Sequence, residues 1–284
     1  MTLPFLKMHG LGNDFVVLDA RVTPIAMTEA AARAIGDRRT GVGYDQLLML
    51  CPPRGAGDVR MRIWNPDGTE AQSCGNGTRA VAQLVMDETG TDKVGIETLG
   101  GFLRAARAPG GLVTVDMGEP RLGWEDIPLA ERMDTRRIDI HIGPIDAPYL
   151  VGPAAVSMGN PHAVFFVDDT SRIQLEKVGP LIENHPLFPE RANVSFAEIR
   201  DSEHVSLRVW ERSAGATLAC GTAACATLVA GVRLGKLARK AEITLPGGPL
   251  IIEWRESDGH VMMTGPAETS FAGTFGPRLT ALLG

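Results

Sequence analysis

The sequence has few cysteines, no excess of basic residues and no long apolar run, and each shortage excludes a class of protein. Four cysteines in 284 residues are too few for a disulfide scaffold, and a reducing compartment would keep them as thiols. No stretch reaches the roughly 18 uninterrupted apolar residues of a membrane span, and the first ten residues carry no apolar run of signal-peptide length. We therefore expect a cytoplasmic protein that does not enter a membrane.

The charge balance argues against nucleic acid as a partner. There are 28 Lys and Arg against 34 Asp and Glu, a net charge of −6, and no basic stripe is visible. The sequence also lacks a Walker motif, a Cys-x-x-Cys pair and a histidine cluster with metal-ligand spacing. Gly10-Leu11-Gly12 lacks the third glycine of a dinucleotide fingerprint, so we interpret it as a turn. These absences leave no candidate metal or nucleotide site.

The chain repeats itself at a nearly constant offset. Arg62-Ile63-Trp64 recurs as Arg208-Val209-Trp210, and ten residues after each tryptophan stands a cysteine, Cys74 and Cys220, followed by glycine. The offset is 220 − 74 = 146 residues. Other pairs follow in the same order at an offset of 147: Gly12-Asn13 with Gly159-Asn160, Gln46 with Asn193, and 96–101 with 243–248. Such a series indicates two homologous halves.

The two halves predict the same local structure. Residues 59–64 and 205–210 alternate and are rich in β-formers, so both are expected to be strands. Helices are predicted over 78–88 and 223–235, followed by strands over 94–98 and 241–245. The second helix is apolar almost all round, which indicates that sheet encloses it. We predict an α+β fold of two homologous domains, 1–120 and 121–267, each a β-sheet or barrel around a central helix, with 118–134 as the linker zone.

The repeated order of strand, loop, Cys-Gly and helix places each cysteine at a helix N-terminus. There the first backbone N–H groups lack partners and the helix dipole is positive. Such a site lowers the pKa of a thiol from about 8.5 toward about 3.5–7.5, and it also binds a carboxylate. If a pseudo-two-fold axis relates the halves, Cys74 and Cys220 can face one bound carbon from opposite sides. One thiolate then removes an α-proton and the other thiol returns one, which inverts the stereocentre.

Structural explanations compete with the chemical one. A cysteine is often only a small buried apolar residue, and we favour that interpretation for Cys51 and Cys225. It stays open for Cys74 and Cys220 taken singly, although their duplicated context favours chemistry. Asparagine in turns usually bonds to the local backbone. That alternative applies to Asn13, Asn65, Asn76, Asn160 and Asn193.

Five stretches together resemble the diaminopimelate epimerase family. They run in order from near the N-terminus to past residue 220, so the resemblance covers essentially the whole chain. They are Lys7-Met8-His9-Gly10-Leu11-Gly12-Asn13-Asp14-Phe15, Asn65-Pro66-Asp67-Gly68-Thr69-Glu70, Cys74-Gly75-Asn76-Gly77, Gly159-Asn160-Pro161-His162 and Ala219-Cys220-Gly221-Thr222.

The resemblance implies epimerisation of LL- to meso-2,6-diaminopimelate, in lysine and peptidoglycan biosynthesis, with neither pyridoxal phosphate nor metal. It implies Cys74 and Cys220 as the acid/base pair, with His162 and Glu211 orienting or tuning the reacting centre. It implies substrate contacts from Asn13, Gln46, Asn65, Gly75, Asn76, Asn160, Asn193, Glu211, Arg212, Gly221 and Thr222. Arg212 suits the distal carboxylate, because guanidinium binds carboxylates bidentately. A homodimer, and a tail 268–284 that returns to the first half, are further implications.

The sequence departs from the family pattern after the second repeated tryptophan. Ser213 stands where the family usually has glycine, and Ala216 where it has glutamate. Ala80 and Ala223 also replace usual cysteine and glycine residues. Three rival functions are a racemase for another amino acid such as proline, an isomerase of the phenazine-biosynthesis type, and a ligand-binding protein without activity. Arg212 argues against the first rival, and the cysteine pair argues against the other two.

Overall fold

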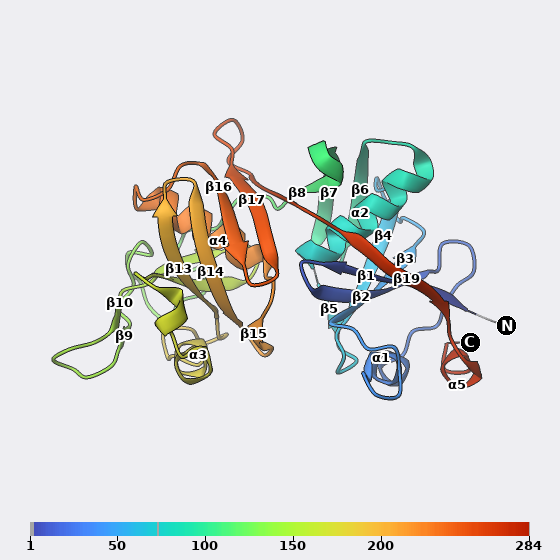
Figure 1. Cartoon of the computed structure of the whole chain (residues 1–284), viewed down its shortest axis with the longest axis horizontal. Coiled ribbons are helices and arrows are strands. Elements are labelled where there is room, and N and C mark those ends of the chain that lie inside the picture. Colours follow the sequence, from blue (N-terminus) through green and yellow to red (C-terminus); the bar gives the residue numbers. More distant parts are fainter. Residues whose placement is uncertain (1–2, 73, 284) are drawn as a thin grey trace. The chain divides into compact units, whose positions relative to one another are not determined.

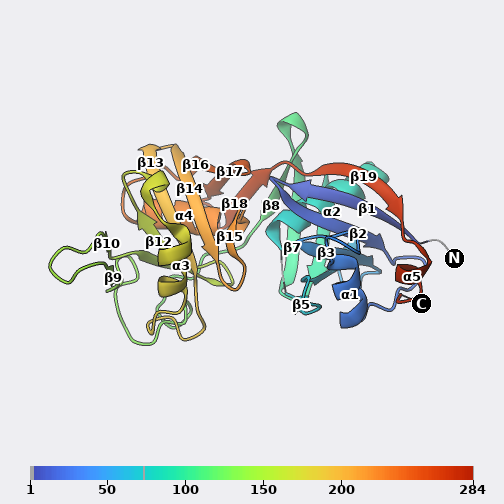
Figure 2. The same cartoon turned by 60° about the horizontal axis from the view of Figure 1, so that its bottom comes forward.

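The computed structural model describes residues 3–72 and 74–283, so residues 1, 2, 73 and 284 of the predicted halves lie outside the described residues (Figures 1 and 2). The chain divides into two compact units, Met1–Val115 with Thr264–Gly284, and Asp116–Met263. We predicted boundaries after residues 120 and 267. In the structure both boundaries fall a few residues earlier.

The first unit contains most of the N-terminal half and the end of the chain. Its elements are β1 (Pro4–Gly10), β2 (Asn13–Asp19), α1 (Glu29–Gly36), β3 (Gln46–Cys51), β4 (Val59–Trp64), β5 (Glu70–Ala71), α2 (Gly75–Thr89), β6 (Lys93–Thr98), β7 (Gly101–Ala108), a 3-10 turn (Pro109–Gly111), β8 (Leu112–Asp116), β19 (Glu268–Thr274) and α5 (Pro277–Thr280). Strand β8 ends one residue beyond the boundary of the unit.

The second unit repeats the order strands, helix, strands, central helix, strands. Its elements are β9 (His141–Ile142), β10 (Leu150–Val151), β11 (Ala154–Ser157), β12 (Pro161–Phe166), a 3-10 turn (Thr170–Arg172), α3 (Leu175–Glu183), β13 (Asn193–Asp201), β14 (His204–Glu211), β15 (Gly215–Thr217), α4 (Gly221–Arg233), β16 (Lys240–Leu245), β17 (Gly248–Trp254) and β18 (Val261–Gly265). Strand β18 likewise runs past the boundary.

The predicted duplication is present in the strand pairing. In the first unit β2 runs parallel to β3 and β4 parallel to β6, with antiparallel neighbours between them. In the second unit β12 and β13 are parallel, as are β14 and β16. Even the register repeats, because Phe15 pairs with Gln46 and His162 with Asn193, each shifted by 147 residues.

Each unit folds around one central helix, as the sequence predicts. Helix α4 buries residues on every side and packs against β11, β12, β13, β16 and β17 (Figure 1). Helix α2 packs against β1, β3, β6 and β7. Both helices begin earlier than the predicted 78 and 223. They start directly after the cysteines, at Gly75 and Gly221, because Cys74 and Cys220 occupy the N-cap positions with extended backbone.

The segment 118–134 is more than the linker that we predicted. It lies in the second unit, and its Ile127 and Leu129 are buried in the apolar core with Phe165 and Phe196. The C-terminal tail is equally well integrated in the first unit. Strand β19 pairs with β1, and the ring of Phe275 stacks on Phe5 at 4.8 Å. Among the described residues, no helix is long and apolar enough to span a bilayer.

Candidate active site

Cys74 has the geometry of a helix cap. Its Sγ accepts a hydrogen bond from the backbone N–H of Gly77 at 3.3 Å, and it lies 3.6 Å from the Oε1 of Gln46, to which the thiol can donate. A Cβ on Gly77 would come within 2.9 Å of Leu48 and 3.3 Å of this sulfur. Glycine at position 77 therefore allows the sulfur to approach the helix amides, where the dipole favours a thiolate.

Three side-chain amides form a hydrogen-bonded chain that reaches this cysteine through Gln46, and each comes from the start of an element. Asn13 opens β2, Gln46 opens β3 and Asn76 is the second residue of α2. The Nδ2 of Asn13 donates to Gln46 Oε1 at 3.1 Å, and the Nδ2 of Asn76 donates to Asn13 Oδ1 at 3.1 Å. The structure thus brings together four predicted site residues. The Gly10-Leu11-Gly12 stretch forms the predicted turn before Asn13, with positive φ at Leu11 and Gly12.

A group of charged side chains that no sequence pattern indicated holds Asn13 in place. The Oδ2 of Asp45 accepts from the Asn13 amide at 3.0 Å, and its Oδ1 accepts from Arg38 at 2.7 Å. Asp14 accepts from Arg38 and Lys7. Burial would raise the pKa of Asp14, but the bonds from Arg38 and Lys7 outweigh it and the pKa is lowered. Asp45 was not predicted as a site residue, because its contact with Asn13 joins residues 32 positions apart.

Asn65 forms local hydrogen bonds within a turn. It follows β4 in a turn, where its Nδ2 donates to Thr69 Oγ1 at 3.1 Å and its carbonyl accepts from Gly68 N at 3.0 Å. The structure therefore shows the local turn role that we named as the alternative. Its contact with substrate stays a prediction.

Cys220 is the counterpart in the second unit, and its surroundings differ. It is buried, and its Sγ lies 3.6 Å from the hydroxyl of Thr222. Burial and then the negative charge of Glu211 raise the pKa of the Cys220 thiol well above its usual value, although the Thr222 hydroxyl partly opposes them. The Cys220 thiol is therefore protonated near pH 7, because burial and Glu211 outweigh the lowering of its pKa that we expected from the helix N-terminus.

The surroundings of Asn160 and His162 only partly match the first unit, because Asn160 is equivalent to Asn13 while His162 stands where the first unit has Phe15. The Nδ2 of Asn160 donates to the Oγ1 of Thr222 at 3.4 Å. The equivalent pair in the first unit is Asn13 and Asn76, where the helix residue Asn76 is the donor. His162 Nε2 lies 2.9 Å from Asn160 Oδ1 and donates to it. Burial, and then the charge of Arg212, lower the pKa of His162 to about 3. His162 is therefore neutral near pH 7 and orients Asn160.

Glu211 is the last residue of β14, and Arg212 follows it directly. The carboxylate of Glu211 accepts from the hydroxyl of Thr217 at 2.5 Å. The backbone N–H of Arg212 donates to Asn193 Oδ1 at 3.0 Å, and its guanidinium donates to the carbonyl of Glu190 at 2.9 Å. Asn193 itself is fixed by a bond to the carbonyl of Pro161. Thr217, like Asp45, is a supporting residue that the sequence did not single out.

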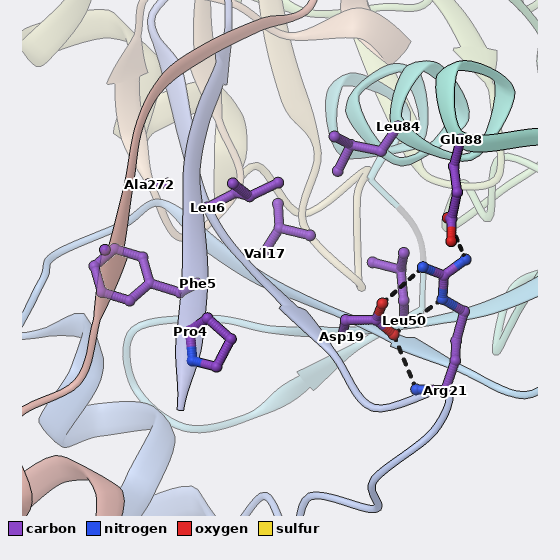
Figure 3. A pocket seen from close by; sticks show the side chains of 11 residues that line it. Pro4, Phe5, Leu6, Val17, Asp19, Arg21, Leu50, Leu84, Glu88 and Ala272 are labelled. Atoms are coloured by element: carbon purple, nitrogen blue, oxygen red, sulfur yellow. Dashed lines mark hydrogen bonds and ion pairs between the residues drawn. The ribbon is translucent and has the colours of Figure 1, made fainter. Parts of the chain in front are cut away.

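The remaining cysteines and one pocket lie outside these clusters. Cys51 and Cys225 are buried in the core, as predicted. Figure 3 shows a pocket of the first unit, and its lining, which includes Leu6, Val17, Leu84 and the Arg21–Glu88 ion pair, contains no predicted site residue. Within residues 3–72 and 74–283, no three His, Cys, Asp or Glu side chains group as metal ligands.

Comparison with known proteins identifies the family of the chain that has these two clusters, around Cys74 and around Cys220. The family model described as diaminopimelate epimerase matches residues 5–123 and 154–270. The chain belongs to the diaminopimelate epimerase family. A diaminopimelate epimerase of Rhodopseudomonas palustris (strain BisB18) is 54% identical over 279 residues, which are 98% of this chain and 96% of that protein. The predictions of an amino-acid epimerase, an isomerase, are confirmed.

Solved structures show that the fold is shared more widely than the diaminopimelate epimerase sequence pattern. A probable proline racemase from Agrobacterium radiobacter K84 has a TM-score of 0.69, with 16% identity, over 97% of this chain and 93% of that one. A PhzF-family phenazine biosynthesis protein of Bacillus anthracis has a TM-score of 0.67, with 16% identity, over 97% and 99%. The predicted α+β fold is confirmed. At such identity these neighbours indicate the fold alone.

Proposed function

We propose that this chain converts LL-2,6-diaminopimelate to the meso isomer by proton transfer between one α-carbon and two thiols, Cys74 and Cys220. The observation that carries the proposal is the repeated cap: in each unit a cysteine occupies the N-cap of the central helix. In each unit the second residue of the central helix also bonds to an asparagine. Asn76 bonds to Asn13 at the start of β2, and Thr222 bonds to Asn160 directly before β12. The activity itself is that of the family, and it belongs to lysine biosynthesis.

The proposed steps balance without any further reagent. One thiolate takes the α-proton, which forms an S–H bond and leaves the electron pair on the α-carbon and its carboxylate. The other thiol then gives its proton to the opposite face and becomes the thiolate. Amide N–H groups at the helix starts, at Gly75-Asn76 and Gly221-Thr222, stabilise the charge that develops on the carboxylate. The proposal requires both sulfurs to reach the same carbon.

Side chains around the two caps give the substrate specificity in this proposal. Arg212 binds the distal carboxylate, and Glu211 accepts from the ammonium groups or tunes the nearby thiol. The remaining contacts are the amides of Asn13, Gln46, Asn65, Asn76, Asn160 and Asn193. Asn13, Gln46 and Asn76 are already held in one hydrogen-bonded chain, which supports a preformed polar surface.

The cellular setting is also part of the proposal. The acidic composition and sparse cysteines support a cytoplasmic enzyme that binds a small molecule and no nucleic acid. Its product would serve peptidoglycan as well as lysine synthesis. A homodimer is expected from the family resemblance alone.

A substrate comparison tests the proposed function. We expect turnover of LL-diaminopimelate to the meso isomer in chelator-treated buffer, and no racemisation of L-proline, which lacks the distal carboxylate. Chromatography on a chiral phase measures both reactions with the same enzyme stock. Racemisation of proline at a comparable rate, or dependence on added metal or pyridoxal phosphate, would contradict the proposal.

A further inference from the structure

Glu183, the last residue of α3, carries a carboxylate whose side chain is only 8% exposed. Its Oε2 accepts from the indole N–H of Trp210 at 2.7 Å, and its Oε1 accepts from the backbone N–H of Ser213 at 2.9 Å. The guanidinium of Arg191 lies 3.5 Å from the same Oε1. A buried carboxylate is costly unless donors surround it, and three donors from separate positions do so here.

The two donors closest to Glu183 flank the dipeptide Glu211-Arg212. Trp210 precedes the dipeptide and Ser213 follows it, so one carboxylate bridges both ends of the segment. Between them, the N–H of Arg212 is held by Asn193 at 3.0 Å. Two consecutive backbone amides are therefore fixed by two different side chains, which sets the direction in which the side chains of Glu211 and Arg212 leave the strand.

The backbone conformation of Ser213 gives its bond to Glu183 a role in the turn. Its φ is +66°, in the left-handed region that costs free energy for a residue with a Cβ. The diaminopimelate epimerase pattern has glycine at this position, which takes the same conformation without that cost. In this chain the bond to Glu183 holds the serine in a conformation that it would otherwise leave.

The first unit has glycine at the position equivalent to Glu183. At the offset of 147, Gly36 ends α1 where Glu183 ends α3. A Cβ on Gly36 would lie 3.1 Å from the ring of Tyr44 and 3.3 Å from Pro66 Cα, so the turn after β4 rests directly on the helix backbone. The shared fold thus forms without a carboxylate here. The carboxylate occurs only in the half that carries Glu211 and Arg212.

We propose that Glu183 is a positioning residue that holds the Glu211–Ser213 turn so that Glu211 and Arg212 meet the substrate. This inference rests on the proposed function, since it concerns the substrate contacts named there. It assigns to Glu183 an effect on substrate affinity that acts through the turn and requires no contact with the substrate.

The variant Glu183→Gln keeps the shape of the side chain but removes one acceptor. We expect KM for LL-diaminopimelate to rise about tenfold or more, the change that follows from losing one hydrogen bond to a charged group, with a smaller change in kcat. In an Arg212→Ala background the same substitution should raise KM by a smaller factor, because the part of its effect that acts through Arg212 is already lost. Equal effects in both backgrounds would overturn the proposal. The control Glu198→Gln alters another carboxylate of the unit, which bonds to Thr170, and should leave KM unchanged.

Proteolysis gives a readout of the turn that does not depend on activity. Trypsin should cut the Arg212–Ser213 bond faster in Glu183→Gln than in the parent enzyme, with other sites unchanged, and Ser213→Gly added to the variant should restore part of the lost affinity. An unchanged cleavage rate at this bond would contradict the positioning role even if the variant were less stable. If Arg212→Ala alone leaves KM unchanged, the proposed role of Arg212 fails, while the proteolysis still decides the role of Glu183.

Discussion

Replacing either Cys74 or Cys220 by alanine should lower the rate of epimerisation by about 10²- to 10⁴-fold, the range that a positioned acid or base contributes. Each thiol serves as base in one direction and as acid in the other, so losing either one should stop both directions. Chiral chromatography of LL- and meso-diaminopimelate during turnover measures this loss.

Matched substitutions separate chemistry from packing. Cys225 lies on α4, five residues after Cys220, and Cys51 ends β3; both are buried in apolar cores. Cys225→Ala and Cys51→Ala should lower stability modestly and leave the rate within about twofold, since neither residue reaches the substrate in this account. Inversion at the parent rate by Cys74→Ala or Cys220→Ala would rule out the two-thiol mechanism.

Arg212→Ala should raise KM for LL-diaminopimelate by about 10²-fold, because a charged hydrogen bond to a carboxylate contributes about 1.5–3 kcal/mol. The distal carboxylate does not change charge during the reaction, so kcat should fall much less. Arg212→Lys should lie between the two, since an ammonium keeps the charge but loses the bidentate fork. Steady-state kinetics over a wide substrate range measure this division.

The control for Arg212 is Arg200→Ala, which removes an exposed arginine of β13 in the same unit. It should leave both kinetic constants unchanged. If KM is also unchanged in Arg212→Ala, another residue binds the distal carboxylate and the proposed basis of specificity is wrong.

Much of the fold follows from local sequence patterns. The strand predicted at 59–64 has the bounds of β4, and β14 extends the strand predicted at 205–210 by one residue at each end. These elements alternate between core and surface, so their side chains specify them locally. The two helices were predicted too short at their N-termini, because a cysteine cap followed by glycine carries no helix propensity of its own. Their starts are set by packing and by the cap geometry.

The segment 118–134 shows where local patterns fail. Its prolines and polar residues predict a linker, yet Ile127 and Leu129 pack into the core of the second unit. The apolar residues of this segment are interrupted by prolines and charged residues, so the surface that receives them determines their burial. Long-range contacts of this kind are invisible in a single sequence.

The candidate site, like the fold, was only partly predictable from the sequence. The duplication identified both cysteines and the asparagines at the strand starts, because repeated residues at a fixed offset can be seen without a structure. The supporting residues Asp45, Thr217 and Glu183 were missed. Asp45 and Glu183 bond to residues about 30 positions away, and carboxylates at such positions look like ordinary surface residues. The neutrality of His162 was also hidden, since it comes from complete burial between elements.

Turnover of LL-diaminopimelate in deuterated water tests the central claim most directly. If two thiols act from opposite faces, the meso product formed at low conversion carries one deuterium at the inverted α-carbon, because the donating thiol has exchanged with solvent. The remaining LL substrate carries none, since the proton taken from it is not returned to the same face. Mass spectrometry of both isomers during the first few per cent of reaction gives this pattern. Protium retained in the product, or deuterium in the unreacted substrate at the same rate, would contradict the two-thiol account.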